Sequence, residues 1–225
     1  MKNLILFLLI LSINICPSYS YALNFSELKP IKLNYNFYDL NDFINSNELK
    51  YSYCQYGAYL DNLNHILKDY KEFKDASLKD LLTNLDSMPD EIALKVKINA
   101  SNALNYEYFF NNLSSEKTFA KGKILKEINN SFSSFDNFKK EFEKIALNSN
   151  SDWIFLALNS QNKLYLTTSK EVSSPVIYKD KIILCLNLDK EIYSNREQII
   201  HNFLNYVDWN IANKNYNLIK LEVKF

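Results

Sequence analysis

The spacing of apolar side chains predicts that the first half of the chain is helical. Between Ile44 and Tyr70 an apolar residue recurs every three or four positions, which places these residues on one face of a long helix. That face carries Leu49, Tyr56, Leu60, Leu63 and Leu67. Ser77 can cap a short helix in SLKDLLTNL, and Pro89 opens a further helix that we expect to reach about Asn112. The two long helices indicate an antiparallel helical hairpin.

In the second half of the chain the spacing of apolar residues changes from a helical period to that of strands. KGKILKEINNSF and SFDNFKKEFEKIALNS read as helices, after which three segments rich in aromatic and branched residues read as strands. These strands are Trp153–Leu158, Lys163–Thr168 and Lys181–Leu188, with the turn SQN joining the first two as a hairpin. Glu197 to Asn213 is expected to form a closing helix. The order predicts an α+β protein of two layers: an N-terminal α-hairpin domain at 23–115 and a C-terminal α/β domain at 116–225 with a three-stranded antiparallel sheet.

Composition excludes two classes of function. The 225 residues carry 26 basic and 26 acidic side chains, so the chain lacks the basic excess with which proteins bind nucleic acid. Only two glycines occur, at Gly57 and Gly122, which excludes a glycine-rich phosphate loop. We therefore expect neither nucleic-acid binding nor nucleotide chemistry.

The N-terminus has the pattern of a secretory signal. Lys2 is followed by an apolar run from Leu4 to Ile15 and by a small-x-small motif that ends at Ala22, so we expect cleavage after residue 22. The run is too short to span a bilayer, so no membrane span is expected after cleavage and the mature protein should be secreted or periplasmic. Cleavage leaves Cys54 and Cys185, which we expect to be unpaired and mostly buried.

Five strings in the same order resemble the iron/manganese superoxide dismutase family. They are IKLNYNFYDLNDFI, YLDNLN, SFSSFDNFKKEF, DWIFLALNSQNKL and NYVDWNIANKN, and the similarity covers Lys32 to about Asn215. The resemblance implies the family fold and a single iron or manganese ion held by three histidines and one aspartate. It also implies the dismutation of superoxide by cycling of that metal.

The positions that match the metal ligands have changed. The resemblance places the first ligand at Tyr51, or at Ser52 in a rival register, and the others at Tyr106, Asn187 and Glu191. None of these is the family's residue, so the resemblance implies a degenerate member. We expect no metal and no other cofactor, and we assign no catalytic residue, because redox tuning depends on ligand identity and on the hydrogen bonds around the ligands. The two histidines, His65 and His201, are expected to face away from the site.

Other matched positions carry the family's features only in part. Tyr59 matches the gateway tyrosine of the substrate channel, and Asn102 stands where some members place a glutamine that bonds the metal-bound solvent. Lys190 replaces a glutamate that reaches across the family's dimer, so the usual dimer is not expected here.

Three functions remain open from the sequence. The favoured one is a secreted pseudoenzyme with a binding or structural role and an unidentified protein partner. The second is a superoxide dismutase or other iron-dependent oxidoreductase with a rearranged, oxygen-rich metal site, because phenolates and a carboxylate suit Fe(III). The third is a non-redox Fe(III)-binding protein. The structural alternative for the changed positions is that the tyrosines fill the vacated cavity and hydrogen-bond to Asn187 and Glu191.

Overall fold

The computed structural model describes residues 27–73, 75–169 and 173–222. The signal peptide expected at residues 1–22 lies outside the described residues. Within them, seven α-helices and three strands build the fold, joined by short 3-10 turns. This is the α+β class that the sequence predicted.

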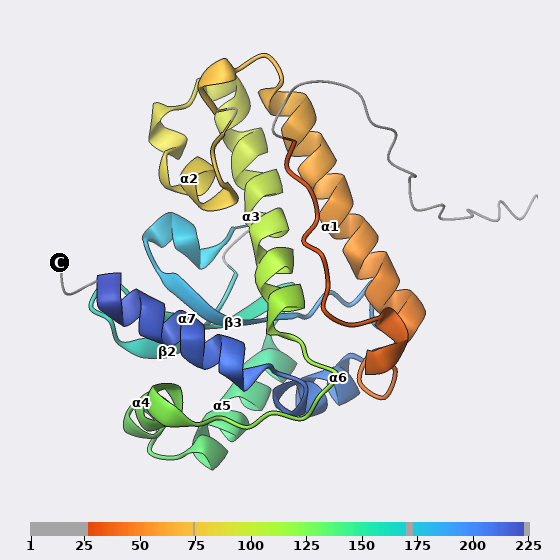
Figure 1. Ribbon diagram of the computed structural model, residues 1–225, viewed down its shortest axis with the longest axis vertical. Helices are drawn as coiled ribbons and strands as arrows, with labels where there is room; N and C mark the ends of the chain where they lie inside the picture. The colour runs from red at the N-terminus through yellow and green to blue at the C-terminus, as the bar shows by residue number, and fades with distance from the viewer. Residues whose placement is uncertain (1–26, 74, 170–172, 223–225) are drawn as a thin grey trace, which may run out of the picture.

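Two long antiparallel helices form the first layer (Figure 1). α1 runs from Ser46 to Leu67 and packs along α3, Asp90–Asn112. Asn45 caps α1, since its side chain accepts a hydrogen bond from the Asn47 N–H at 2.9 Å. The short helix α2, Leu78–Thr83, also packs against α3 and begins with the predicted cap at Ser77. The helical hairpin of the sequence analysis is therefore confirmed, with ends within a few residues of those expected.

The second layer is a three-stranded antiparallel sheet with helices around it. β1, Trp153–Leu158, is central, between β2, Leu164–Thr168, and β3, Lys181–Asn187. All six residues of β1 are buried. α3 and α7, Trp209–Glu222, contact β3, and α4, Gly122–Phe132, contacts β2. α5, Phe135–Asn148, packs beside α4 and against α6, Arg196–Asn202.

One predicted helix is wrong. The expected single helix from Glu197 to Asn213 is divided into α6, a 3-10 turn at Phe203–Asn205, and α7. Between them Val207 pairs as an isolated bridge with Leu113, and the Tyr206 carbonyl accepts the Ser114 N–H at 2.8 Å. Asp208 then caps α7, because its Oδ1 accepts from the N–H groups of Asn210 and Ile211. Tertiary pairing with the segment after α3 outweighs the continuous helical pattern.

The cysteine expectation holds for one residue only. Cys185 is free and buried in β3, where it packs as a small apolar side chain. Cys54 is disulfide-bonded, so the prediction that it is unpaired is wrong. Cys54 is half-buried on α1, where its sulfur is accessible to a bonding partner, whereas the sheet encloses the Cys185 thiol completely.

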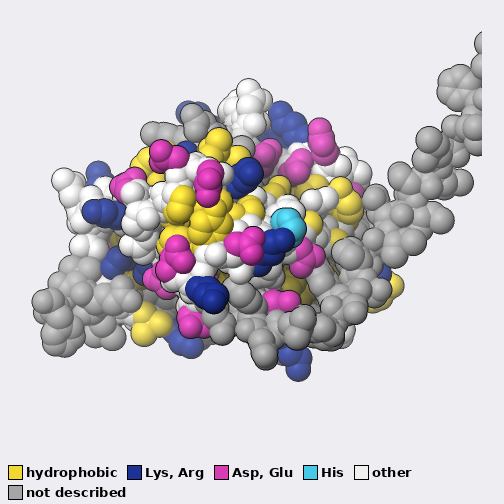
Figure 2. Space-filling model, turned by 90° about the horizontal axis from the view of Figure 1, so that it is seen from above, with side chains coloured by type: hydrophobic (Ala, Val, Ile, Leu, Met, Phe, Trp, Pro, Cys, Tyr) yellow, Lys and Arg dark blue, Asp and Glu magenta, His cyan; other side chains and the backbone are white. Residues whose placement is uncertain are grey.

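The described residues carry charges of both signs at the surface, and their helices can be compared with the requirements of a membrane span. Among the described residues, no helix combines the length and apolar character that a bilayer crossing requires. Figure 2 shows one face, on which acidic and basic side chains are interspersed around a central apolar patch. This mixture agrees with the formal net charge of zero.

Candidate functional site

The inward face of α1 decides between the two registers for its site residue. Ser52 is fully buried, one turn before the buried Tyr56. Tyr51 is 37% exposed, and its hydroxyl accepts a hydrogen bond from Gln55 Nε2 at 2.7 Å on the outer face. The structure therefore brings Ser52, the alternative position, into the interior and leaves Tyr51 at the surface.

Ser52 belongs to a directed chain of hydrogen bonds. Its Oγ donates to the Glu48 carbonyl at 3.0 Å and lies 3.1 Å from the Tyr193 hydroxyl. A hydroxyl has one proton, so Tyr193 must be the donor to Ser52. Tyr193 is 4% exposed, and burial raises its pKa above the ordinary value. The sequence reasoning missed Tyr193, although a tyrosine two residues after Glu191, next to the apolar Ile192, was the available signal.

Tyr106 lies at the centre of an aromatic cluster. It projects from α3, is 3% exposed, and packs edge-on against Trp153 with ring centroids 4.8 Å apart. Tyr56, Tyr59 and Phe110 stack around the same ring. Burial raises the pKa of Tyr106 well above its usual range, and the nearby Asn187 amide lowers it in part. Tyr106 therefore stays a neutral phenol at physiological pH.

Asn187, at the end of β3, presents a donor to this cluster. Its Oδ1 accepts the Asp189 N–H at 2.7 Å, which fixes the orientation of the amide. Its Nδ2 is buried and has no hydrogen-bond partner of good geometry, and the amide lies near enough to Tyr106 to lower the pKa of that phenol. The interior therefore holds an N–H donor where a cation would need an oxygen.

Glu191 lies apart from the buried group. It is exposed on the turn after β3, and its N–H donates to Asp189 Oδ1 at 2.8 Å. It lines a hollow of about 340 Å³ together with Asp152, Asp189 and Lys190. Burial raises the Asp152 pKa, and the charges of Asp189 and Glu191 raise it further. The hollow is therefore acidic.

Tyr59 stands between the acidic hollow and the aromatic cluster. Its ring stacks on Tyr106 with centroids 6.1 Å apart. Burial raises the pKa of Tyr59, and the negative charges of Asp189 and Asp152 raise it further. A half-buried phenol in this position can donate a hydrogen bond, but the nearby carboxylates disfavour its ionisation.

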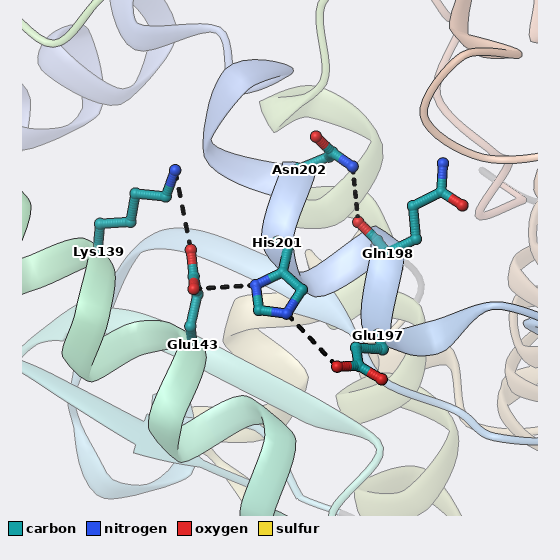
Figure 3. Close-up of polar contacts among 6 residues, drawn as sticks. All are labelled: Lys139, Glu143, Glu197, Gln198, His201 and Asn202. Atoms are coloured by element: carbon teal, nitrogen blue, oxygen red, sulfur yellow. Dashed lines mark hydrogen bonds and ion pairs between the residues drawn. The ribbon is translucent and has the colours of Figure 1, made fainter.

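The remaining polar candidates, Asn102, His65 and His201, either bond within their own helix or lie at the surface. Asn102 is 6% exposed, and its amide donates to the Ile98 carbonyl of its own helix at 3.0 Å. His65 is exposed on α1. His201 is exposed on α6, where its Nδ1 lies 2.9 Å from Glu143 Oε2 and its Nε2 lies 3.7 Å from Glu197 Oε1 (Figure 3). Both histidines lie at the surface, as the sequence indicated.

Comparison with known proteins identifies the scaffold. Residues 120–215 match the family model of iron/manganese superoxide dismutases, C-terminal domain. Superoxide dismutase [Mn] 1 of Leptolyngbya boryana is 25% identical over 214 residues, which cover 91% of this chain and 86% of that protein. Superoxide dismutase [Mn] 2 of Bacillus anthracis is 27% identical over 193 residues, which cover 82% of this chain and 92% of its own length.

Over most of its length the chain is therefore similar to iron/manganese superoxide dismutases. Superoxide dismutase [Mn] 2 of Bacillus cereus is similar to the same extent, with 28% identity over 193 residues that cover 82% of this chain and 92% of that protein. These relatives match across both layers of the fold, whereas the family model matches the second layer only.

The side chains present do not fit the iron or manganese of the family. In the described part of the chain, no three His, Cys, Asp or Glu side chains gather closely enough to hold a metal ion. The buried group offers two neutral phenols, a serine hydroxyl and an amide whose oxygen is already bonded to a backbone N–H. Iron and manganese sites of this kind need imidazole or carboxylate donors, and the inward Nδ2 of Asn187 would oppose a cation.

Proposed function

We propose that this chain is a metal-free member of the superoxide dismutase family, a pseudoenzyme with a binding or structural role. The observation that carries the proposal is the identity of the buried polar group: Ser52, Tyr106, Asn187 and Tyr193. In the family this region is implied to hold the metal. Here it is filled by aromatic packing and by the hydrogen-bond chain from Tyr193 to Glu48.

The charge of the neighbouring hollow supports the same proposal. Superoxide is an anion, and a dismutase gains from a positive field that steers its substrate. The hollow beside Tyr59 carries Asp152, Asp189 and Glu191 against the single cation Lys190. Such a field repels superoxide from the position of the family's gateway tyrosine.

We further propose that the protein acts outside the cytoplasm, without the dimer of the family. The signal-like pattern at residues 1–22 supports the first point. For the second, Lys190 stands where the family has a bridging glutamate, and its amino group donates to Asn150 Oδ1 at 3.3 Å within the same chain. Size-exclusion chromatography with light scattering tests the oligomeric state.

Elemental analysis of purified protein tests the central proposal. We expect no stoichiometric iron or manganese after expression in medium supplied with both metals, and no removal of superoxide. One tightly bound metal per chain with dismutase activity would overturn the proposal. A purple or red protein whose colour fades in Tyr106→Phe would replace it with an Fe(III)-phenolate enzyme, and equilibrium Fe(III) binding without superoxide removal would replace it with a non-redox iron-binding protein.

Back-substitution tests the physical reason. The triple variant Ser52→His, Tyr106→His and Asn187→Asp places two ligand types of the family, imidazole and carboxylate, in the buried group and leaves the outward Glu191 unchanged. We expect it to bind manganese more tightly than the unchanged protein does. The control replaces Ser52→His by Tyr51→His, because Tyr51 faces outward. Equally tight manganese binding by the two triple variants would show that our placement of Ser52 is wrong.

A further inference from the structure

A groove of about 790 Å³ opens between the segment that joins α3 to α4 and the first turns of α5 and α7. Its apolar lining includes Phe119, Leu125, Phe135, Tyr206 and Trp209. This volume is typical of small-molecule sites, which are mostly apolar with a few polar groups at fixed positions. None of the lining residues belongs to the buried group of Ser52, Tyr106, Asn187 and Tyr193.

Hydrogen bonds fix the walls of the groove. The Thr118 hydroxyl donates to the Val207 carbonyl at 2.7 Å and accepts the Trp209 N–H at 2.8 Å. Figure 1 shows this linker running from the end of α3, past α6 and the start of α7, to α4. The groove is therefore preformed, so a ligand would not have to order its walls.

The floor is apolar. Phe135 packs edge-on against Trp209 with ring centroids 5.4 Å apart. The indole N–H of Trp209 donates to the Leu204 carbonyl at 3.1 Å, and Trp209 itself is only 1% exposed, so it supports the half-buried Phe135 from beneath. At the rim, Phe119 leaves 77% of its surface exposed, although a large aromatic side chain gains free energy when it is covered.

Positive charge predominates at the rim. Lys117 is exposed, Lys139 is half-buried, and Asp136 is the one carboxylate among the residues that line the groove. Lys139 Nζ lies 3.8 Å from Glu143 Oε1, beyond hydrogen-bonding distance, while the other oxygen of Glu143 contacts His201 (Figure 3). Lys139 therefore retains donor capacity for an anion at the mouth of the groove.

We propose that this groove binds a small amphipathic anion, with its aliphatic or aromatic body on Phe119, Phe135 and Tyr206 and its carboxylate between Lys117 and Lys139. The charge at the rim selects an acid over an amine with the same tail. This inference is independent of the proposed function, since it uses none of the residues of the buried group.

Calorimetric titration with dodecanoate, kept below its micelle concentration, tests the proposal. Dodecyltrimethylammonium has the same tail with the opposite charge, and we expect it to bind at least about tenfold more weakly. The double variant Lys117→Glu with Lys139→Glu should weaken dodecanoate binding by about tenfold or more. Its matched control is Lys140→Glu with Lys144→Glu, which changes two exposed lysines of α5 that do not line the groove, and the control should bind as the unchanged protein does.

Phe119→Ser provides a second variant that leaves the core intact, because Phe119 is largely exposed. It should weaken dodecanoate binding several-fold without changing the urea midpoint of unfolding. Three results would overturn the proposal: no binding of dodecanoate, equal binding of the cationic probe, or equal weakening by the control pair. A dimer that Phe119→Ser dissolves, in a protein that does not bind dodecanoate, would assign the groove to contact between copies instead.

Discussion

Removal of the Ser52 hydroxyl should destabilise the protein more than removal of its partner hydroxyl on Tyr193. Tyr193 donates to Ser52, which in turn donates to the Glu48 carbonyl. In Tyr193→Phe, Ser52 keeps its bond to Glu48, so only one hydrogen bond is lost. In Ser52→Ala, the Tyr193 hydroxyl stays buried without an acceptor, because both residues are almost fully enclosed.

The structure sets the size of this asymmetry. Loss of one satisfied hydrogen bond costs about 1 kcal/mol, whereas a buried polar group left unpaired costs about 1 to 3 kcal/mol. We expect about 1 kcal/mol for Tyr193→Phe, about 2 kcal/mol for Ser52→Ala, and about 1 kcal/mol for the double variant, in which no buried hydroxyl is orphaned. The summed losses of the two single variants therefore exceed the loss of the double variant by about 2 kcal/mol.

Equilibrium unfolding in urea, followed by circular dichroism, measures the three variants. With a slope of about 2 kcal/mol per molar urea, Ser52→Ala should lower the midpoint by about 1 M and Tyr193→Phe by about half of that. Ser115→Ala, at an exposed serine, is the control and should leave the midpoint unchanged. Additive effects, or a larger loss for Tyr193→Phe, would refute the directed chain.

Three further predictions follow from other contacts. Burial raises the Glu107 pKa above its ordinary value of 4.5, so the stabilising contribution of its protonated form is complete below that value and is lost as pH rises through the folded pKa. Glu107→Gln should therefore raise the urea midpoint at pH 7 but not at pH 4, and an equal rise at both would contradict this. The Arg196 side chain donates hydrogen bonds to the carbonyls of Leu188, Ala146 and Ser149. A lysine cannot reach all three, so Arg196→Lys should lower the free energy of unfolding in urea by about 2 to 3 kcal/mol. A loss under about 0.5 kcal/mol, the effect of an ordinary surface substitution, would show that these three bonds do not stabilise the fold. Burial raises the Tyr106 pKa, so the stability that the neutral phenol contributes is complete below the unfolded pKa of 10.0 and is lost at higher pH. Tyrosinate absorbance at 295 nm should therefore include a step that coincides with loss of circular dichroism. Ionisation of every tyrosine while the protein stays folded would contradict this prediction.

The sequence predicted those parts of the fold in which local pattern and tertiary contacts agree. The apolar spacing from Leu49 to Leu67 matches the buried face of α1, and the segment Trp153–Leu158 is β1 to the residue. The break between α6 and α7 could not be predicted, because it depends on pairing of Val207 with Leu113, far away in sequence. Local helical spacing carries no information about such a bridge.

The candidate site was predicted in part for the same reason. Tyr106 and Asn187 were identified, and the structure encloses both. The choice between Tyr51 and Ser52 requires the rotation of α1 about its axis, and one residue corresponds to about 100° of that rotation. Glu191 was expected beside the tyrosines, but the turn after β3 carries it outward and brings Tyr193 inward. In a turn, side-chain direction is set by backbone geometry that periodicity does not describe.

The linker between α3 and α4 has a consequence for how the molecule comes apart. Three of its residues, Leu113, Ser114 and Thr118, form hydrogen bonds through backbone or hydroxyl groups with residues 206 to 209. These bonds join the first layer to the second. A single proteolytic cut near Glu116 should therefore yield two fragments that elute together under native conditions and separate only in denaturant. The two layers are distinct in sequence, but we expect these contacts to make them unfold together.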